Sequence, residues 1–266
     1  MSQTTHIDAA RDRVTAERAA ATDTRAGMAS FVDRITDLST ASSPTGTSGV
    51  AGTGGLAHRT ELSGFGGCEA VRTAFAETVH AHTAASGESD ASMSQPVTAV
   101  IRGELTESIA VALAPASSVP FSPELKRGIL TEARHRQSEL DVLCRALDRE
   151  SASLDAAADT VASVSSWIAA ADKTPLSELG FDALRRRHEA LAAHRERCDD
   201  AVADRQSVLA STTAIGADAG VRHRDLAGSI YDGLSVDHPV LATVVRLDDV
   251  CRECQQAVRA HLVRRA

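Results

Sequence analysis

Apolar residues recur every seven positions near the amino terminus, which predicts one amphipathic helix over residues 1–41. The residues at this interval are Ile7, Val14, Ala21, Met28 and Ile35. Such a repeat is typical of a helix that buries one apolar stripe, here called a seam, against another helix. Glu17 and Thr24 stand at the intermediate positions, so the seam is weak at its start and we expect this helix to need a partner surface.

A longer apolar pattern begins at Ser122, which can cap a helix whose first residue is Pro123. Its seam has 3-and-4 spacing and consists of Leu140, Leu143, Leu147, Leu154, Ala157, Val161, Val164 and Ile168. Only Glu150 interrupts the apolar series. No breaker follows before "DKTPLSELG", so the pattern predicts a helix of roughly 50 residues and roughly 75 Å. This length favours an elongated architecture over a compact one.

The chain then continues with a predicted turn over 173–180 and two further helices. The first carries Leu184, Leu191, Cys198, Val202 and Leu209 on one stripe. A looser stretch with one short helical piece over 226–234 follows. Pro239 opens the last helix, whose seam holds Val244, Leu247, Cys251, Cys254 and Val258. Residues 122–266 are therefore predicted to form a long helical hairpin and a carboxyl-terminal helix.

The middle of the chain has a different composition. Residues 42–67 are rich in Ser, Thr and Gly and have no apolar periodicity, which predicts a flexible linker. Residues 68–121 are predicted to hold two shorter helices, marked by Val71, Phe75 and Val79 and by Ile101, Leu105, Ile109 and Leu113. No segment alternates as a strand does. The sequence therefore predicts an all-α fold, an elongated helical hairpin or antiparallel coiled-coil bundle with a flexible Gly/Ser linker.

The charge balance bears on the choice of partners. The 266 residues include 36 Asp and Glu against 28 Lys and Arg, a net charge of −8, which opposes general attraction to nucleic acid or anionic lipid. Lys126 and Lys173 are the only lysines, and an acidic, lysine-poor chain fits a salt-adapted proteome. Nucleic acid is therefore a disfavoured partner, and a protein partner or a second copy is preferred.

The amino terminus shows no secretory pattern, and no apolar stretch is long enough to cross a membrane. We therefore expect a cytoplasmic protein without a membrane partner. The five cysteines are odd in number and irregular in spacing, which fits reduced thiols.

The C-x-x-C pair formed by Cys251 and Cys254 is the main candidate for chemistry. Both residues fall at seam positions, so the pattern predicts two buried small apolar side chains. The alternative is a zinc or thiol site, because Cys198 would lie level with Cys251 if the last helix folds back, with His194 one turn away. The sequence names no catalytic, cofactor-binding or metal-ligating residue beyond this alternative, and no cofactor.

Two basic clusters, "LRRRHEAL" and "RAHLVRR", lie in helices that also carry acids. A solvated helix face explains them, and contact with phosphate is the alternative.

The segments "HIDAARDRVTAERAA", "FSPELKRGILTEARHRQSELDVLCRALDRESASL", "FDALRRRHEALAAHRERCDDAVADRQ" and "YDGLSVDHPVLATVVRLDDVCR" resemble a family of haloarchaeal helical proteins that carry a domain of unknown function. The resemblance covers nearly the whole chain apart from the Gly/Ser linker. It implies a haloarchaeal cytoplasm and supplies no catalytic residues.

These observations favour a non-enzymatic protein that associates with other proteins or with itself through helix seams. A regulatory nucleic-acid-associated protein, and a zinc or thiol sensor using Cys198, Cys251 and Cys254, are the alternatives.

Overall fold

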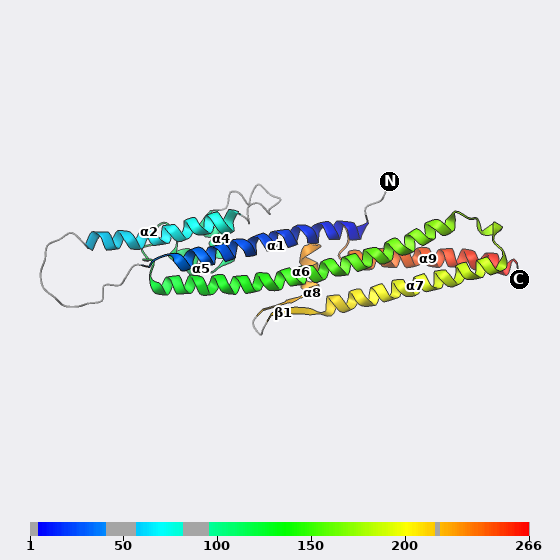
Figure 1. The fold of residues 1–266 in the computed structure, drawn as a ribbon. Coiled ribbons are helices and arrows are strands. Elements are labelled where there is room, and N and C mark those ends of the chain that lie inside the picture. The colour runs from blue at the N-terminus through cyan, green and yellow to red at the C-terminus, as the bar shows by residue number, and fades with distance from the viewer. Residues whose placement is uncertain (1–4, 41–56, 82–95, 216–218, 266) are drawn as a thin grey trace. The chain divides into compact units, whose positions relative to one another are not determined.

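The structure is a computed structural model that describes residues 5–40, 57–81, 96–215 and 219–265. These residues are mostly helical, so the predicted all-α class is confirmed for the part of the chain described (Figure 1). They form two compact units: unit 1 comprises residues 1–18 and 145–266, and unit 2 comprises residues 19–144. The division between the units falls inside the helices α1 (His6–Asp37) and α6 (Pro123–Asp172).

The helix α6 has the predicted length of 50 residues. The Ser122 hydroxyl accepts a hydrogen bond from the Leu125 amide at 3.2 Å, which satisfies one of the unpaired donors of the first turn. A short 3-10 turn, η3 (Leu176–Glu178), lies in the predicted turn before α7 (Phe181–Ala210). The last helix, α9 (Pro239–Val263), begins at the predicted proline.

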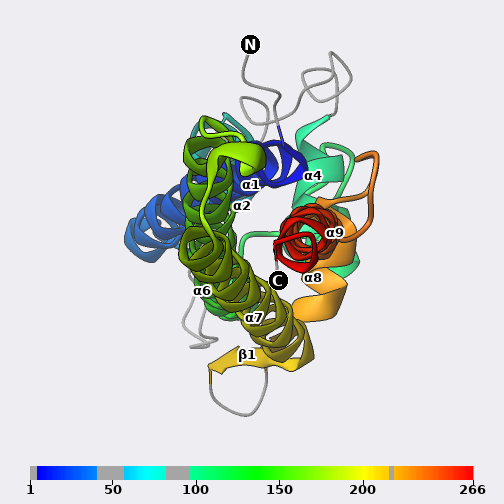
Figure 2. The same cartoon turned by 90° about the vertical axis from the view of Figure 1, so that its right-hand side faces the viewer.

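In unit 1 the helices α6, α7 and α9 lie along one another (Figure 1). Arg187 near the start of α7 binds the Ala171 carbonyl near the end of α6, whereas Arg205 near the end of α7 binds Glu150, so these two helices run in opposite directions. The helix α9 also runs antiparallel to α7, because Arg195 binds Asp248, whereas Gln255, further along α9, donates to the carbonyl of His188, which lies earlier on α7. Figure 2 looks along these helices from the end where α6 meets α7. The predicted seams supply the buried residues Leu154, Val164, Leu184, Leu191, Val244 and Val258.

The connection from α7 to α9 contains two short strands that the sequence analysis did not predict. The strand β1 (Thr212–Ile215) pairs antiparallel with β2 (Ala219–Arg222), with Thr213 opposite Val221. The helix α8 (His223–Ile230) follows directly, where one short helical piece was expected. The prediction that no strand forms is therefore wrong, because four-residue strands are too short to show an alternating pattern.

Unit 2 packs the second part of α1 and the first part of α6 with three further helices. These are α2 (Ala57–Phe75), which continues into the π-helical turn η1 (Ala76–His80), α4 (Val97–Glu104) and α5 (Glu107–Ala112). Phe31 and Phe75 meet edge to face, with ring centroids 5.3 Å apart. At Gly67 an added Cβ would lie 2.7 Å from the Cβ of Phe121, so only glycine allows this approach.

Two predictions for the middle of the chain require correction. The stretch 57–67, which was assigned to the flexible linker, belongs to α2. The rest of the predicted linker, residues 42–56, lies outside the described residues. The single helix expected over 101–113 is two helices, because Thr106 is extended and its hydroxyl caps α5 by accepting from the Ile109 amide at 3.3 Å.

Candidate functional site

A fully buried polar cluster lies in unit 1, centred on Glu150. Arg205 donates to both carboxylate oxygens at 2.8 Å, and the His223 Nε2 lies 2.5 Å from Oε2. The Tyr231 hydroxyl donates to Oε1. The carboxylate thus has three partners from two other parts of the chain. These four residues are called the Glu150 cluster.

The local sequence explains why these side chains point inward. Glu150 occupies a seam position of α6, between the buried Leu147 and Leu154, so the helical period directs it into the unit. Arg205 follows the buried Cys198 by seven residues in α7 and lies on the same face. His223 is the first residue of α8 and Tyr231 directly follows its end, so one carboxylate holds both ends of this short helix.

The partners fix the charge of Glu150. Burial alone would raise the pKa of this carboxyl group, but the hydrogen bonds from His223 and Arg205 and the positive charge of Arg205 lower it to about 2. Burial and the charge of Glu150 raise the pKa of Tyr231 well above its usual range. The carboxylate is therefore ionised and the phenol is protonated at neutral pH.

The hydrogen positions on His223 follow from this charge state. Because the ionised carboxylate can only accept, we assign the proton to Nε2 of His223. The buried Nδ1 has no hydrogen-bond partner among the described residues. Within the Glu150 cluster the positive charge of Arg205 balances the negative charge of Glu150. The cluster joins three elements of unit 1, so it is suited to fixing α8 against α6 and α7.

A cavity of about 310 Å³ reaches one edge of the Glu150 cluster. Arg205 and Ser153 line it, and Arg205 donates to the Ser153 hydroxyl at 3.1 Å. Its rim carries Asp200 and Asp204, one turn apart on α7. Glu150 and Tyr231 are not among its lining residues, so the carboxylate and the phenol face no open space there.

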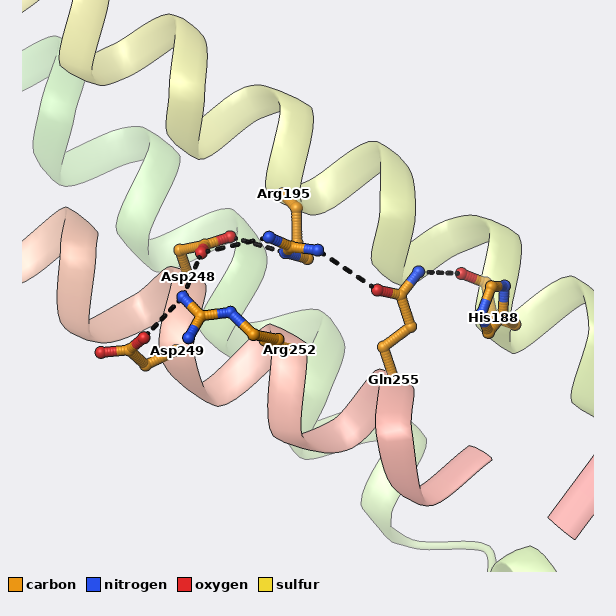
Figure 3. Close-up of polar contacts among 6 residues, drawn as sticks. All are labelled: His188, Arg195, Asp248, Asp249, Arg252 and Gln255. Carbon is orange, nitrogen blue, oxygen red and sulfur yellow. Dashed lines mark hydrogen bonds and ion pairs between the residues drawn. The ribbon is translucent and has the colours of Figure 1, made fainter. Parts of the chain in front are cut away.

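A second polar network joins α7 to α9 at the surface of unit 1 (Figure 3). Its central pair is Arg195 and Asp248, with Nε and Oδ1 2.8 Å apart, and Arg252 binds the other oxygen of Asp248 at 2.9 Å. Arg252 also pairs with Asp249, and Gln255 bridges Arg195 to the His188 carbonyl. Burial would raise the pKa of Asp248, but its two arginine partners lower it. This group of six residues is called the α7–α9 network.

The predicted thiol site is only partly assembled. Cys198 and Cys251 are both buried, and Cys198 lies close enough to Cys251 to affect its pKa, as expected if α9 folds back along α7. Burial, and then the proximity of Cys198, raises the pKa of Cys251 to about 11. Both thiols are therefore protonated at neutral pH, which disfavours thiolate chemistry.

The other two residues of that alternative point elsewhere. Cys254 stands three residues after Cys251 on α9 and lines a separate cavity together with Trp167 and Asp172. His194 packs against the Trp167 ring, with centroids 4.7 Å apart. No group of three or more His, Cys, Asp or Glu side chains in the described residues could hold a metal ion. The described residues therefore do not bring the four side chains of the zinc alternative together. The burial predicted from the seam is confirmed for Cys251, whereas Cys254 is only half-buried.

The two basic clusters identified in the sequence meet at one end of unit 1. Arg265, just after α9, donates to the carbonyls of Ser177 and Leu179, which directly precede α7. The sequence analysis did not predict this convergence, because it depends on the path of the chain between α7 and α9.

Sequence reasoning recognised Glu150 only as an interruption of a seam and missed Arg205, His223 and Tyr231. Arg205 carried a signal, since it extends the seven-residue series Leu184, Leu191, Cys198. His223 and Tyr231 carried none, because they belong to a segment without apolar periodicity.

Within the described ranges, no helix combines the length and the apolar character needed to cross a membrane. Neither the curated proteins nor the solved structures contain a match to this chain. One family model matches, over residues 5–255, and its description is a domain of unknown function, DUF7260. Because this match covers nearly the entire sequence, the chain belongs to the DUF7260 family.

Proposed function

We propose that this protein is a non-enzymatic interaction or scaffold protein that associates through the helix faces of unit 1, first of all with a second copy of itself. The observation that carries the proposal is the apolar surface left on the α7–α9 pair. Val245 is 53% exposed and Val263 is 72% exposed. Eighteen residues are five helical turns, so the two valines lie on the same face of α9. An antiparallel coiled-coil packing of α6, α7 and α9 belongs to the same proposal, supported by their directions and buried seams.

The chemistry of the buried groups supports a role without catalysis. The pKa of Glu150 is lowered and that of Tyr231 is raised, so both values lie further from neutral pH than usual, whereas a general acid or base needs a pKa near it. The pKa values of Cys198, Cys251 and Cys254 are all raised, chiefly by burial. Each of these groups is better explained by its contribution to packing than by reactivity.

Light scattering coupled to gel filtration in molar KCl tests the association. We expect twice the chain mass of 27.8 kDa at micromolar concentration. Val245→Ser should raise the dissociation constant of the dimer at least about tenfold, since an interface loses a large apolar contact. Val250→Ser is the matched control, because Val250 lies on the same helix about 140° away. A compact monomer at every concentration would contradict self-association.

A regulatory protein associated with nucleic acid is the second candidate function. The convergence of the two basic clusters at one end of unit 1 favours it, while the net charge of −8 opposes it. A titration with a DNA duplex over a range of KCl concentrations is the test. Affinity that falls steeply with salt would support this function, and an absence of binding at the lowest salt concentration would remove it.

A cytoplasmic location in a salt-adapted, haloarchaeal host is part of the leading proposal. The acidic, lysine-poor composition supports it. Unfolding temperatures measured from low to molar KCl should rise with salt, because screening weakens the repulsion between the many carboxylates.

A further inference from the structure

The end of unit 1 where α6 stops, α7 begins and α9 stops has a charge opposite to that of the whole chain. Residues 172–189 and 253–265 contain seven basic and five acidic side chains, which leaves 21 basic and 31 acidic side chains elsewhere. The basic residues are Lys173, Arg185, Arg186, Arg187, Arg259, Arg264 and Arg265. Arg265 joins the two segments through its bonds to Ser177 and Leu179, as the position of the end of α9 in Figure 1 illustrates.

Most of these charges are not neutralised by carboxylates. Arg187 donates to the carbonyls of Ala171 and Thr174, at 2.6 and 3.3 Å, and Arg264 donates to the Ala260 carbonyl. Carbonyl groups satisfy the donors but leave the positive charge in place. In the α7–α9 network, by contrast, Arg195 and Arg252 share the carboxylate of Asp248 (Figure 3).

Arg186 and Arg259 are both exposed and form no ion pair with any described residue. Arg186 directly precedes Arg187, and Arg259 directly follows Val258. Arg187 and Val258 both belong to this same end of unit 1. The positive field at this end is therefore available to a negatively charged partner.

The same end contains an apolar cavity of about 190 Å³. Its lining includes the apolar residues Trp167, Ile168, Pro175, Leu176 and Val258, and also the charged residues Asp172 and Arg187. A space of roughly 150 Å³ in an apolar interior accepts a benzene ring, so this cavity has room for one large apolar side chain. Phe181, at the start of α7, is 49% exposed and adds further apolar surface at this end.

We propose that this basic end is a docking site for an acidic protein segment that places one apolar side chain in the cavity. The proposal rests on the proposed function, because it assumes that the protein acts by association, and it adds the position of one interface and the charge of its partner. Basic side chains around an apolar cavity complement such a segment in both charge and shape.

A protein partner accounts for the site better than a nucleic acid does. Proteins that bind single-stranded nucleic acid stack its bases on open aromatic faces, whereas the Trp167 ring at this end already packs against His194, with ring centroids 4.7 Å apart. The exposed Phe181 matches apolar side chains of a protein.

Selection from a displayed library of random peptides without tryptophan tests the proposal directly on the full chain. The selection is made at the lowest KCl concentration at which circular dichroism shows the chain folded. We expect enriched peptides with acidic residues around a Leu, Ile or Phe. Their binding should change the emission of Trp167, which is the only tryptophan of the chain.

Charge reversal at the two unpaired arginines then locates the binding. The double variant Arg186→Glu/Arg259→Glu should weaken the enriched peptides at least about tenfold. Arg145→Glu/Arg246→Glu is the matched control in unit 1, with two exposed arginines that make no ion pair among the described residues. This control should bind like the unchanged protein.

Three outcomes would overturn the docking site. They are enrichment of peptides that are no more acidic than the input library, equal binding of the enriched peptides to both double variants, and a single-stranded DNA that binds at this end in place of peptides. None of them bears on the dimer mass, so the proposed self-association stands or falls separately.

Discussion

The Glu150 cluster and the α7–α9 network both join helices of unit 1 through arginine and carboxylate, but only one of them is removed from water. The Arg205–Glu150 and Arg195–Asp248 pairs have the same shortest distance, 2.8 Å. The side chains of Glu150 and Arg205 are 0% and 3% exposed, whereas those of Asp248 and Arg195 are 17% and 35% exposed. The distance within an ion pair therefore says little about its energy, because burial sets the cost of losing one partner.

Burial also changes what each network can specify. A buried carboxylate must keep all its partners, so the Glu150 cluster is satisfied in one arrangement of α6, α7 and α8. If the Arg195–Asp248 pair is broken, both side chains can bind water instead, so the free energy of unfolding should change little. We therefore expect the Glu150 cluster to fix the register of unit 1, and the α7–α9 network to add only to its surface.

Removing the buried carboxylate should have the largest effect. Glu150→Ala leaves Arg205 buried without a counter-charge, so we expect unit 1 to lose about 3–5 kcal/mol of unfolding free energy. Urea denaturation in molar KCl, followed by circular dichroism, measures the loss.

The matched control for this change is Asp155→Ala, five residues later on α6. Asp155 pairs with Arg11 at 2.6 Å, but both side chains are about half exposed. Its removal should cost under about 1 kcal/mol. Similar losses from the two substitutions would show that burial does not separate the two kinds of ion pair.

Acid should weaken the buried pair over a defined pH range. The pKa of Glu150 is lowered from 4.5 to about 2 in the folded state. A lowered folded pKa gives stability that is complete above the unfolded value and is lost as pH falls from about 4.5 to about 2, by about 3 kcal/mol.

Urea denaturation between pH 7 and pH 2 tests this range for the unchanged chain and for Glu150→Gln. The difference in unfolding free energy between the two should narrow by about 3 kcal/mol on acidification. Other carboxylates, such as Asp248, titrate in both proteins and cancel in the difference. A constant difference would mean that Glu150 does not ionise as the structure implies.

The main helices of unit 1 and one half of the Glu150 cluster could be predicted from the sequence. Apolar spacing and breaker residues predict the lengths of α6 and α9, the cap at Ser122 and the burial of Cys251. The structure contains each of these features. Glu150 was visible as the single break in an apolar seam. A seam glutamate and a seam arginine on neighbouring helices together predict a buried pair, so Arg205 could have been recognised.

The remaining partners could not be predicted in the same way. His223 and Tyr231 reach Glu150 because the strands β1 and β2 and the helix α8 redirect the chain, and their short lengths leave no period to detect. The start of α2 at Ala57 was missed for a related reason. Glycine and serine lower helix propensity, and packing within the unit overrides that preference.

Removing the phenolic hydroxyl should have an intermediate effect. Tyr231→Phe keeps the buried ring and deletes one hydrogen bond to an ionised carboxylate, so we expect a loss of about 2 kcal/mol. It should also raise the pKa of Glu150, because that bond is one of the causes of its lowered value. The pH series described for Glu150→Gln detects both changes, and a loss under about 0.5 kcal/mol would place the hydroxyl outside the Glu150 cluster.

The partly exposed Arg195–Asp248 pair should show the smallest loss of stability and the largest dependence on salt. Asp248→Asn removes the charge that Arg195 and Arg252 share, but both arginines can turn to water, so we expect a loss of about 0.5 kcal/mol. Because salt screens exposed charges, the loss should shrink further from about 0.15 M to molar KCl. The loss from Glu150→Ala should stay nearly constant over that range, since buried pairs are screened much less. Denaturation of both variants at the two salt concentrations separates the cases, and a loss above about 2 kcal/mol for Asp248→Asn would mean that this network is a structural element equal to the buried one.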